Sequence, residues 1–236
     1  MCSGSFKNSG LIIAIFVYMK NLVVLIACNL LIFNGFTQET EGYVQFDIEV
    51  QAVDTTIKAK QQAGLLRNSK MEIFFSQDFS RVDFEMGELY KLAAVVNLKT
   101  NRTISLMSGK IGKYATRTIT KDTASVDSLL PVANSVELLE GSKIILGYSC
   151  KKAILTANGM ESTYWYTNDI DIDISGQQIT NPLIPGFPME FYSVAEGVLM
   201  HFRASNIVFE VENKEEVFFT DIPLGYTLIQ DVGKLD

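Results

Sequence analysis

Few side chains in this chain of 236 residues belong to the types that carry out acid–base, nucleophilic or metal chemistry. His201 is the only histidine, which excludes a multi-histidine metal site and leaves at most one histidine-dependent proton relay. The sequence contains no Gly-x-Ser-x-Gly motif, phosphate-binding loop or dinucleotide fingerprint. We therefore expect no enzymatic activity, no catalytic residues and no cofactor, and we place His201 on a strand face between Leu199 and Arg203.

The best metal-binding pattern is an acidic run in which Asp169, Asp171 and Asp173 alternate with isoleucines. With Asp171 as the first position of a calcium-binding loop, the third, fifth and sixth positions also carry suitable residues. The twelfth position, which should be a bidentate glutamate, is Pro182. The run therefore predicts a strand with a solvated acidic face and no metal site.

The cysteines predict neither a disulfide nor a zinc site. Cys2 and Cys28 lie in the N-terminal apolar region and are lost if that region is removed, which leaves Cys150. A single thiol can form neither an intramolecular disulfide nor a cysteine-based zinc site. We expect Cys150 to pack in the core as a small hydrophobic residue, with a reactive or intermolecular thiol as the alternative.

The N-terminal apolar stretch has the order of an export signal. Met19 and Lys20 give a charged start, which is followed by an apolar run to Phe33 and then by small and polar residues. We predict that residues 1–18 are an upstream extension from a misassigned start, that residues 19–38 are a signal peptide, and that residues 39–236 form a single domain. An uncleaved membrane anchor, or lipidation of Cys28 in a lipobox-like segment, is the alternative.

The chain is acidic, which limits its partners. Its formal charge is -7 at pH 7, from 20 Lys and Arg against 27 Asp and Glu. An acidic surface repels the phosphates of nucleic acids and the anionic headgroups of lipids. We expect no nucleic-acid partner, and membrane contact only through an uncleaved signal or a lipid anchor.

From Tyr43 onward, apolar residues recur with a period of two, which is the pattern of half-buried β-strands. Arg81, Asp83 and Glu85, for example, alternate with apolar residues and predict a strand with one wet and one dry face. Residues 55–70 are the exception, because their Lys, Ala and Gln content permits a short helix or a loop.

The stretch from 143 to 174 is the best specified part of the chain. It contains Asn158-Gly159, the dipeptide that most favours a two-residue hairpin turn, and we expect it to form a central hairpin. Residues 121–140, around Pro131, predict short helical turns or a loop that crosses the sheet as a lid. About ten strands in all predict a mainly β fold, a strongly curved antiparallel sheet or half-barrel with one or two short covering helices.

Several short motifs in this order resemble those of a known family. They are Gly-Tyr-Ser-Cys-Lys-Lys-Ala at 147–153, Trp-Tyr-Thr-Asn-Asp-Ile at 165–170, Ile-Pro-Gly-Phe-Pro-Met-Glu at 184–190, and the closing segment at 219–226. They resemble the GLPGLI-type secreted envelope proteins of Gram-negative bacteria and a related domain of unknown function. That resemblance implies a fold similar to LolA and LolB, and a location in the periplasm or at the outer-membrane periphery.

The resemblance also implies a function. A LolA-like sheet would bind or carry a lipid, a lipoprotein or another hydrophobic ligand in its concave face. The residues that we expect in such a cavity are Phe84, Leu106, Tyr148, Trp165, Phe187 and Phe191. The alternative is a non-catalytic structural or protein-interaction module of the cell envelope, with an envelope protein as its partner.

Overall fold

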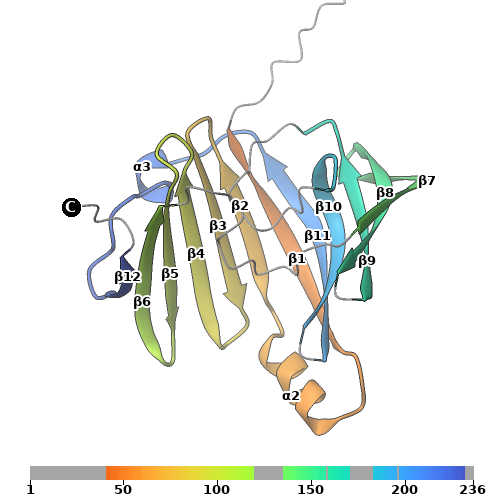
Figure 1. Cartoon of the computed structure of the whole chain (residues 1–236), viewed down its shortest axis with the longest axis horizontal. Helices are drawn as coiled ribbons and strands as arrows, with labels where there is room; N and C mark the ends of the chain where they lie inside the picture. The colour runs from red at the N-terminus through yellow and green to blue at the C-terminus, as the bar shows by residue number, and fades with distance from the viewer. Residues whose placement is uncertain (1–40, 120–134, 158, 171–182, 196, 232–236) are drawn as a thin grey trace, which may run out of the picture. The chain divides into compact units, whose positions relative to one another are not determined.

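The computed structural model describes residues 41–119, 135–157, 159–170, 183–195 and 197–231 (Figure 1). The chain divides into two units, 1–38 and 39–236, and all described residues lie in the second. They form a mainly β unit with one twelve-stranded sheet, in the order β12-β6-β5-β4-β3-β2-β1-β11-β10-β9-β8-β7. The end strands β12 and β7 do not pair with each other, so the sheet is open.

The described elements follow one another as short strands with two helices. The strands are β1 (Gly42–Ala52), β2 (Lys70–Phe75), β3 (Phe79–Met86), β4 (Tyr90–Asn97), β5 (Arg102–Gly109), β6 (Gly112–Ile119), β7 (Ser135–Ile145), β8 (Tyr148–Ala157), β9 (Met160–Thr167), β10 (Phe187–Ala195), β11 (Val198–Val208) and β12 (Thr227–Asp231). The helices are α2 (Ile57–Leu65) and α3 (Lys214–Val217). Neighbouring strands are antiparallel except β12 and β6, which run parallel, so the predicted wholly antiparallel sheet needs this one correction.

β1 lies inside the sheet, between β2 and β11. Val44 and Phe46 are fully buried, whereas Asp47 and Glu49 are exposed. The half-buried strand predicted from Tyr43 is therefore confirmed. The helix permitted by residues 55–70 is α2, and it begins where the Thr56 hydroxyl accepts a hydrogen bond from the Ala59 amide at 3.2 Å.

The described part of this stretch, from 143 to 170, includes β8, β9 and the end of β7, which lie at one end of the sheet, so the prediction of a central hairpin is wrong (Figure 1). β8 and β9 pair with Ala157 opposite Met160, so two residues connect them, as predicted, although Asn158 itself lies outside the described residues. A second two-residue turn, Leu146-Gly147, separates β7 from β8, with φ of 50° and 87°. The alternation of apolar residues did not reveal this turn, because Leu146 falls in step with the strand residues around it.

The predicted lid at 121–140 is wrong in its second part. Residues 135–140 belong to β7, and Val136 packs against the main core. The segment has apolar residues at 136, 138 and 139, which suit a strand, and it pairs with β8 at the end of the sheet. These features favour a strand over helical turns. The first part of the predicted lid lies outside the described residues, as do Asp171, Asp173 and Pro182 of the acidic run.

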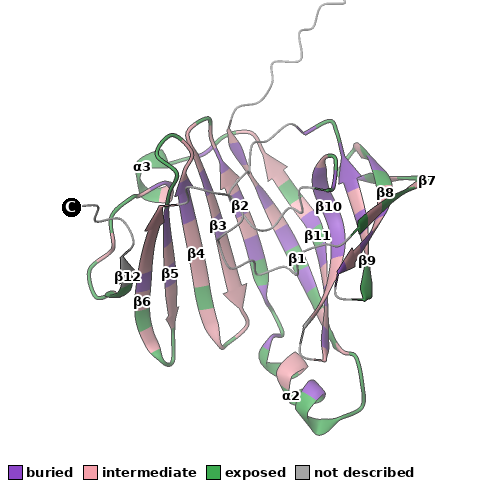
Figure 2. Ribbon diagram, in the orientation of Figure 1, coloured by how far each residue is buried: buried purple, intermediate pink, exposed green. Residues whose placement is uncertain are grey.

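The main core lies against one face of the sheet, and the strands that contribute to it are β1 to β3 and β7 to β11 (Figure 2). Phe191 is at its centre. Its ring stacks on Phe202 at 4.5 Å and on Tyr164 at 5.3 Å, and it meets the edge of Phe46 at 6.1 Å between ring centroids. Burying each such aromatic side chain stabilises the fold by about 1.5–3 kcal/mol.

A second apolar cluster lies on the opposite face, over β4 to β6. The register places Ala93 beside Asp83 and Leu106 beside Ala93, so all three share the face that turns away from the main core. Ile104, Leu106 and Ala115 are buried there under Phe219, Ile222 and Tyr226. We call residues 217–226, which provide this cover, the C-terminal strap.

Among the helices that the structure describes, none combines the length and the apolar character needed to cross a membrane. Residues 1–18 and 19–38 lie outside the described residues. The predicted upstream extension, the signal peptide and the alternatives of an anchor or lipidation at Cys28 therefore stay predictions.

Candidate functional site

The face of the sheet that turns away from the main core carries a row of alternating charges. Each of the following side chains stands directly opposite the next on a neighbouring strand: Lys91, Glu85, Lys70, Asp47, Arg203 and Glu190. Opposite charges across paired strands attract, whereas like charges repel. This order of charges therefore supports the register of the six neighbouring strands β4, β3, β2, β1, β11 and β10. We call these six residues the charged row.

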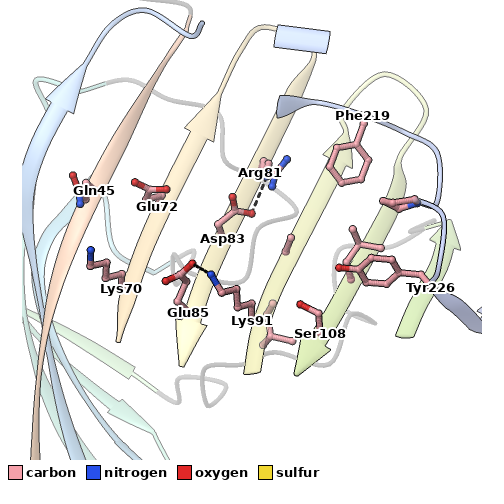
Figure 3. Close-up of a pocket in the computed structure, with 14 residues that line it drawn as sticks. Gln45, Lys70, Glu72, Arg81, Asp83, Glu85, Lys91, Ser108, Phe219 and Tyr226 are labelled. Carbon is pink, nitrogen blue, oxygen red and sulfur yellow. Dashed lines mark hydrogen bonds and ion pairs between the residues drawn. The ribbon is translucent and has the colours of Figure 1, made fainter. Parts of the chain in front are cut away.

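One end of the charged row opens into a cleft of about 600 Å³. Its lining comes from β1 to β5 and from the C-terminal strap: Gln45, Lys70, Glu72, Arg81, Asp83, Glu85, Lys91, Leu92, Ala93, Leu106, Ser108, Phe219, Pro223 and Tyr226. In Figure 3 the carboxylates of Glu72, Asp83 and Glu85 rise from two adjacent strands, and the rings of Phe219 and Tyr226 stand across from them. This volume is in the range of small-molecule sites.

The strands place these side chains through their period of two. On β3, Val82 faces the main core, whereas Arg81 and Asp83 face the cleft. On β2, Glu72 lies directly opposite Asp83 and beside Gln45 on β1. The cleft is therefore polar over β1 to β3 and more apolar over β4 and β5, where Ala93 and the buried Leu106 lie beside Lys91 and Ser108.

Arg81 fixes the strap that forms the far wall of the cleft. Its Nη1 donates a hydrogen bond to the carbonyl oxygen of Val217 at 2.7 Å, and its guanidinium lies 5.1 Å from the ring centroid of Phe219. Its Nε also contacts Oδ1 of Asp83 at 2.8 Å. One half-buried side chain therefore joins the charged face to the wall, and a planar guanidinium is suited to three such contacts at once.

The charges in the cleft are balanced, but they are not equally paired. Three cationic and three anionic residues line it, and Arg81–Asp83 and Lys91–Glu85 form ion pairs. Glu72 makes no hydrogen bond or ion pair with any of the described residues. Burial, and then the charges of Asp83 and Glu85, raise the pKa of Glu72.

The other end of the charged row is a compact ion cluster around Glu190, whose side chain is only 5% exposed. Nζ of Lys143 lies 2.5 Å from its Oε2, and Nε2 of His201 lies 3.2 Å from its Oε1. Burial alone would raise the pKa of Glu190, but Lys143 and His201 together hold it below its ordinary value. The ring of Tyr192 stacks on His201 at 4.3 Å, which completes the cluster on a strand face, as predicted for His201.

The structure separates the six residues predicted to line a cavity. Leu106 lines the cleft. Phe187 and Phe191 are buried within the main core, and Phe84, Tyr148 and Trp165 pack against it. The other cleft residues were not singled out from the sequence, although the alternation of Arg81, Asp83 and Glu85 gave a signal for them. The strap was noted from the sequence only as a closing motif at 219–226, and its place on the sheet could not be predicted because it depends on tertiary contacts.

The described residues offer no metal centre. No three of their His, Cys, Asp or Glu side chains are grouped so as to hold a metal ion. Cys150 is a fully buried free thiol, as predicted for a core residue, and burial raises its pKa.

A family model described as "N-glycanase peptide, N-terminal domain" matches residues 92–190, from β4 to the first part of β10. A comparison with curated proteins found no match.

Several solved structures are similar to this chain, and three of them are described here. Two are structures of PNGF-II, in space groups C2 and P21, with 16% and 15% identity, TM-scores of 0.45 and 0.47, and coverage of 80% and 81% of this chain. The chain spans only 31% and 32% of those proteins. The third is an uncharacterized conserved protein from Thermus thermophilus, with 11% identity and a TM-score of 0.47, of which 91% is covered by 81% of this chain. These values establish no shared activity.

The family match corrects the resemblance inferred from the motifs. The GLPGLI-type and LolA-like assignment is wrong, because the family model that matches across 147–153, 165–170 and 184–190 describes a different domain. The lipid-carrier function and the envelope-module alternative that followed from that assignment are wrong with it. The motifs misled because they reflect local requirements of a sheet: a hairpin turn at 146–147, a strand at 165–167 and a proline-rich turn before β10.

Proposed function

We propose that residues 39–236 form a non-catalytic carbohydrate-binding domain that holds a neutral oligosaccharide in the cleft. The observation that carries this proposal is the position of Glu72, which has no ionic partner among the described residues, beside Gln45 and across the cleft from the rings of the C-terminal strap. A sugar presents hydroxyl groups at its edge and C–H groups on its faces. Carboxylate and amide groups can bind the hydroxyls, while Phe219 and Tyr226 can cover a ring face.

The charges of the cleft favour a neutral ligand. Asp83 neutralises Arg81 and Glu85 neutralises Lys91, so neither cation is free to attract an acidic sugar. Lys70 and Glu72 remain, and their charges balance each other. The match of residues 92–190 to a domain named after an N-glycanase supports a carbohydrate as the ligand class.

The same pairing supports a binding role without catalysis. Glycoside hydrolysis commonly uses two carboxyl groups that are both free to act, one as an acid and the other as a base or nucleophile. In the cleft, Asp83 and Glu85 are occupied by cations, which leaves Glu72. We also propose that the domain acts outside the cytoplasm, in the periplasm or at the outer-membrane periphery, because the apolar N-terminal stretch has the order of an export signal.

Calorimetric titration of the chain with N-acetylglucosamine and mannose oligomers of one to four sugars tests the proposal. We expect saturable binding, and we expect Glu72→Ala to weaken it about 10- to 100-fold, because a hydrogen bond to a charged group is lost. Glu161→Ala is the matched control, since Glu161 is exposed on β9 and lies outside the cleft lining. Absence of binding to every oligomer, or equal binding by the Glu72→Ala variant, would overturn the proposal.

Catalysis is tested in parallel by incubating the chain with a glycopeptide and with each oligomer. We expect no released sugar or glycan by mass spectrometry. Release that is lost in the Glu72→Ala variant would show that the cleft is an active site.

A further inference from the structure

We infer that the ligand surface extends beyond the cleft onto an aromatic shelf formed by Tyr43 and Phe74, which acts as a second sugar subsite. This inference rests on the proposed function. The two rings stand directly opposite each other on β1 and β2, with their centroids 5.5 Å apart and an angle of 36° between their planes. They are the next residue pair, on the same face of the sheet, after the cleft pair Gln45 and Glu72.

The shelf is adjacent to the cleft. Residues two apart on a strand are separated by roughly 7 Å, so the shelf lies about one sugar ring beyond the carboxylate of Glu72. Phe74 is also directly opposite Arg81, which anchors the wall of the cleft. When one sugar of a chain binds Glu72 in the cleft, the next sugar can therefore reach the shelf.

Core packing does not account for the position of these rings. Neither Tyr43 nor Phe74 belongs to the main core or to the cluster under the strap. Both are half-buried on the face that carries the charged row, where their neighbours along the strands are Gln45 and Glu72. Each ring is held in place by the other and leaves apolar surface on a face of the sheet that is otherwise polar. Such a ring is suited to cover one face of a sugar.

A polar side chain completes the shelf. Asn206, which is exposed on β11 opposite Gln45, places its Nδ2 3.4 Å from the hydroxyl oxygen of Tyr43. As the Tyr43 oxygen accepts this contact, its proton is free to be donated to a ligand. The shelf therefore combines an apolar surface with a hydroxyl and an amide at its rim, which is the chemistry that a second neutral sugar requires.

The subsite is tested by the dependence of affinity on chain length, measured by calorimetry with the same N-acetylglucosamine and mannose oligomers. For the wild type we expect affinity to rise about five- to tenfold at the length that first reaches the shelf. Phe74→Leu, which keeps an apolar side chain but removes the ring, should abolish this rise and leave the affinity for the single sugar unchanged. Tyr43→Phe, which keeps the ring, should retain most of the rise.

Tyr192→Ala is the control variant, because Tyr192 is an aromatic residue on the same face that stacks on His201 and lies outside the cleft lining. Thermal melting should confirm that each variant is folded. If short oligomers bind but affinity does not rise with length, or if Phe74→Leu weakens all lengths equally, the subsite is refuted while the proposed function stands. If no oligomer binds to the wild type, the proposed function fails and the subsite fails with it.

Discussion

Glu72 and Glu190 lie on the same face of one sheet, yet their surroundings shift their pKa values in opposite directions. Glu190 is surrounded by Lys143, His201 and Arg203, and its pKa is lowered. Glu72 is desolvated beside two other carboxylates, and its pKa is raised. The first arrangement stabilises contacts between strands. In the second, the charged form of Glu72 is disfavoured, and a ligand that donates hydrogen bonds to the carboxylate would stabilise it.

The two carboxylates differ in their ionic partners. This difference, rather than the degree of burial, distinguishes the structural cluster around Glu190 from the proposed binding site around Glu72. Glu190 is the more buried of the two, but its oxygens are already occupied. Glu72 is half-buried and has no such partner among the described residues. Four substitutions test this distinction.

Glu190→Ala should have the largest effect, lowering the free energy of unfolding by about 2–4 kcal/mol, because it leaves Lys143 without its buried counter-ion and removes the carboxylate oxygen that lies 3.2 Å from Nε2 of His201. The contribution of Glu190 is present above its ordinary pKa of 4.5 and is lost as the pH falls through its lowered folded-state pKa. Urea denaturation at pH 7 and below pH 4.5 measures both effects. A change below about 0.5 kcal/mol at pH 7 would contradict a structural role.

Arg81→Lys should lower the free energy of unfolding by about 1–2 kcal/mol, because one ammonium group cannot contact Asp83, the Val217 carbonyl and the ring of Phe219 together. Amide hydrogen exchange in the strap should become faster, while exchange in β8 and β9 stays unchanged. Unaltered exchange at 217–226 would show that the strap is held without Arg81.

Glu72→Gln should act in the opposite direction and raise the free energy of unfolding at pH 7 by about 0.2–1 kcal/mol, because it removes a like charge opposite Asp83. The raised pKa means that the folded state binds a proton more readily than the unfolded state does. Wild-type stability from this group therefore falls as the pH rises from 4.5 through the raised pKa.

The gain from Glu72→Gln should consequently vanish below pH 4.5, where Glu72 is protonated in both states. Denaturation curves of the wild type and the variant between pH 4 and 8 provide the measurement. A variant that is less stable than the wild type at pH 7 would mean that Glu72 is a stabilising residue like Glu190.

Lys91→Gln should have the smallest effect, below about 0.5 kcal/mol, since Lys91 and Glu85 form an exposed ion pair with 65% and 45% of their side-chain surfaces accessible. The same denaturation assay gives the value. A loss larger than that of Arg81→Lys would show that the charged row contributes through pairs at the surface as well as through buried ones.

The sequence predicted those parts of the fold that depend on neighbours along the chain. The alternation at 81–86 placed the charged side chains on one face, and Asn-Gly placed the turn before β9. Longer-range features could not be predicted in this way. Glu72 stands beside Gln45 because β1 and β2 pair, and Phe219 reaches the cleft because Arg81 holds the strap. Neither contact can be predicted from a local sequence pattern.

The six aromatic and apolar residues predicted for a cavity show the same limit. Hydrophobic residues identify a buried face, but they do not tell whether the protein or a ligand fills it. Phe191 is packed among Phe202, Tyr164 and Phe46, and only Leu106 of the six lines the cleft. The polar members of the cleft resemble an ordinary solvated strand face until the register brings them together.

The position of β1 has a consequence for synthesis of the chain. Strands β2 to β6 can pair in order as each leaves the ribosome, whereas β1 lacks one neighbour until β11 has been made, since Tyr43 pairs with Val208. Such late, long-range pairing makes folding slow compared with local hairpins. A nascent chain that ends before Val198 leaves β1 with a free hydrogen-bonding edge beside its apolar face, so truncated products of this protein are exposed to aggregation through the centre of the sheet.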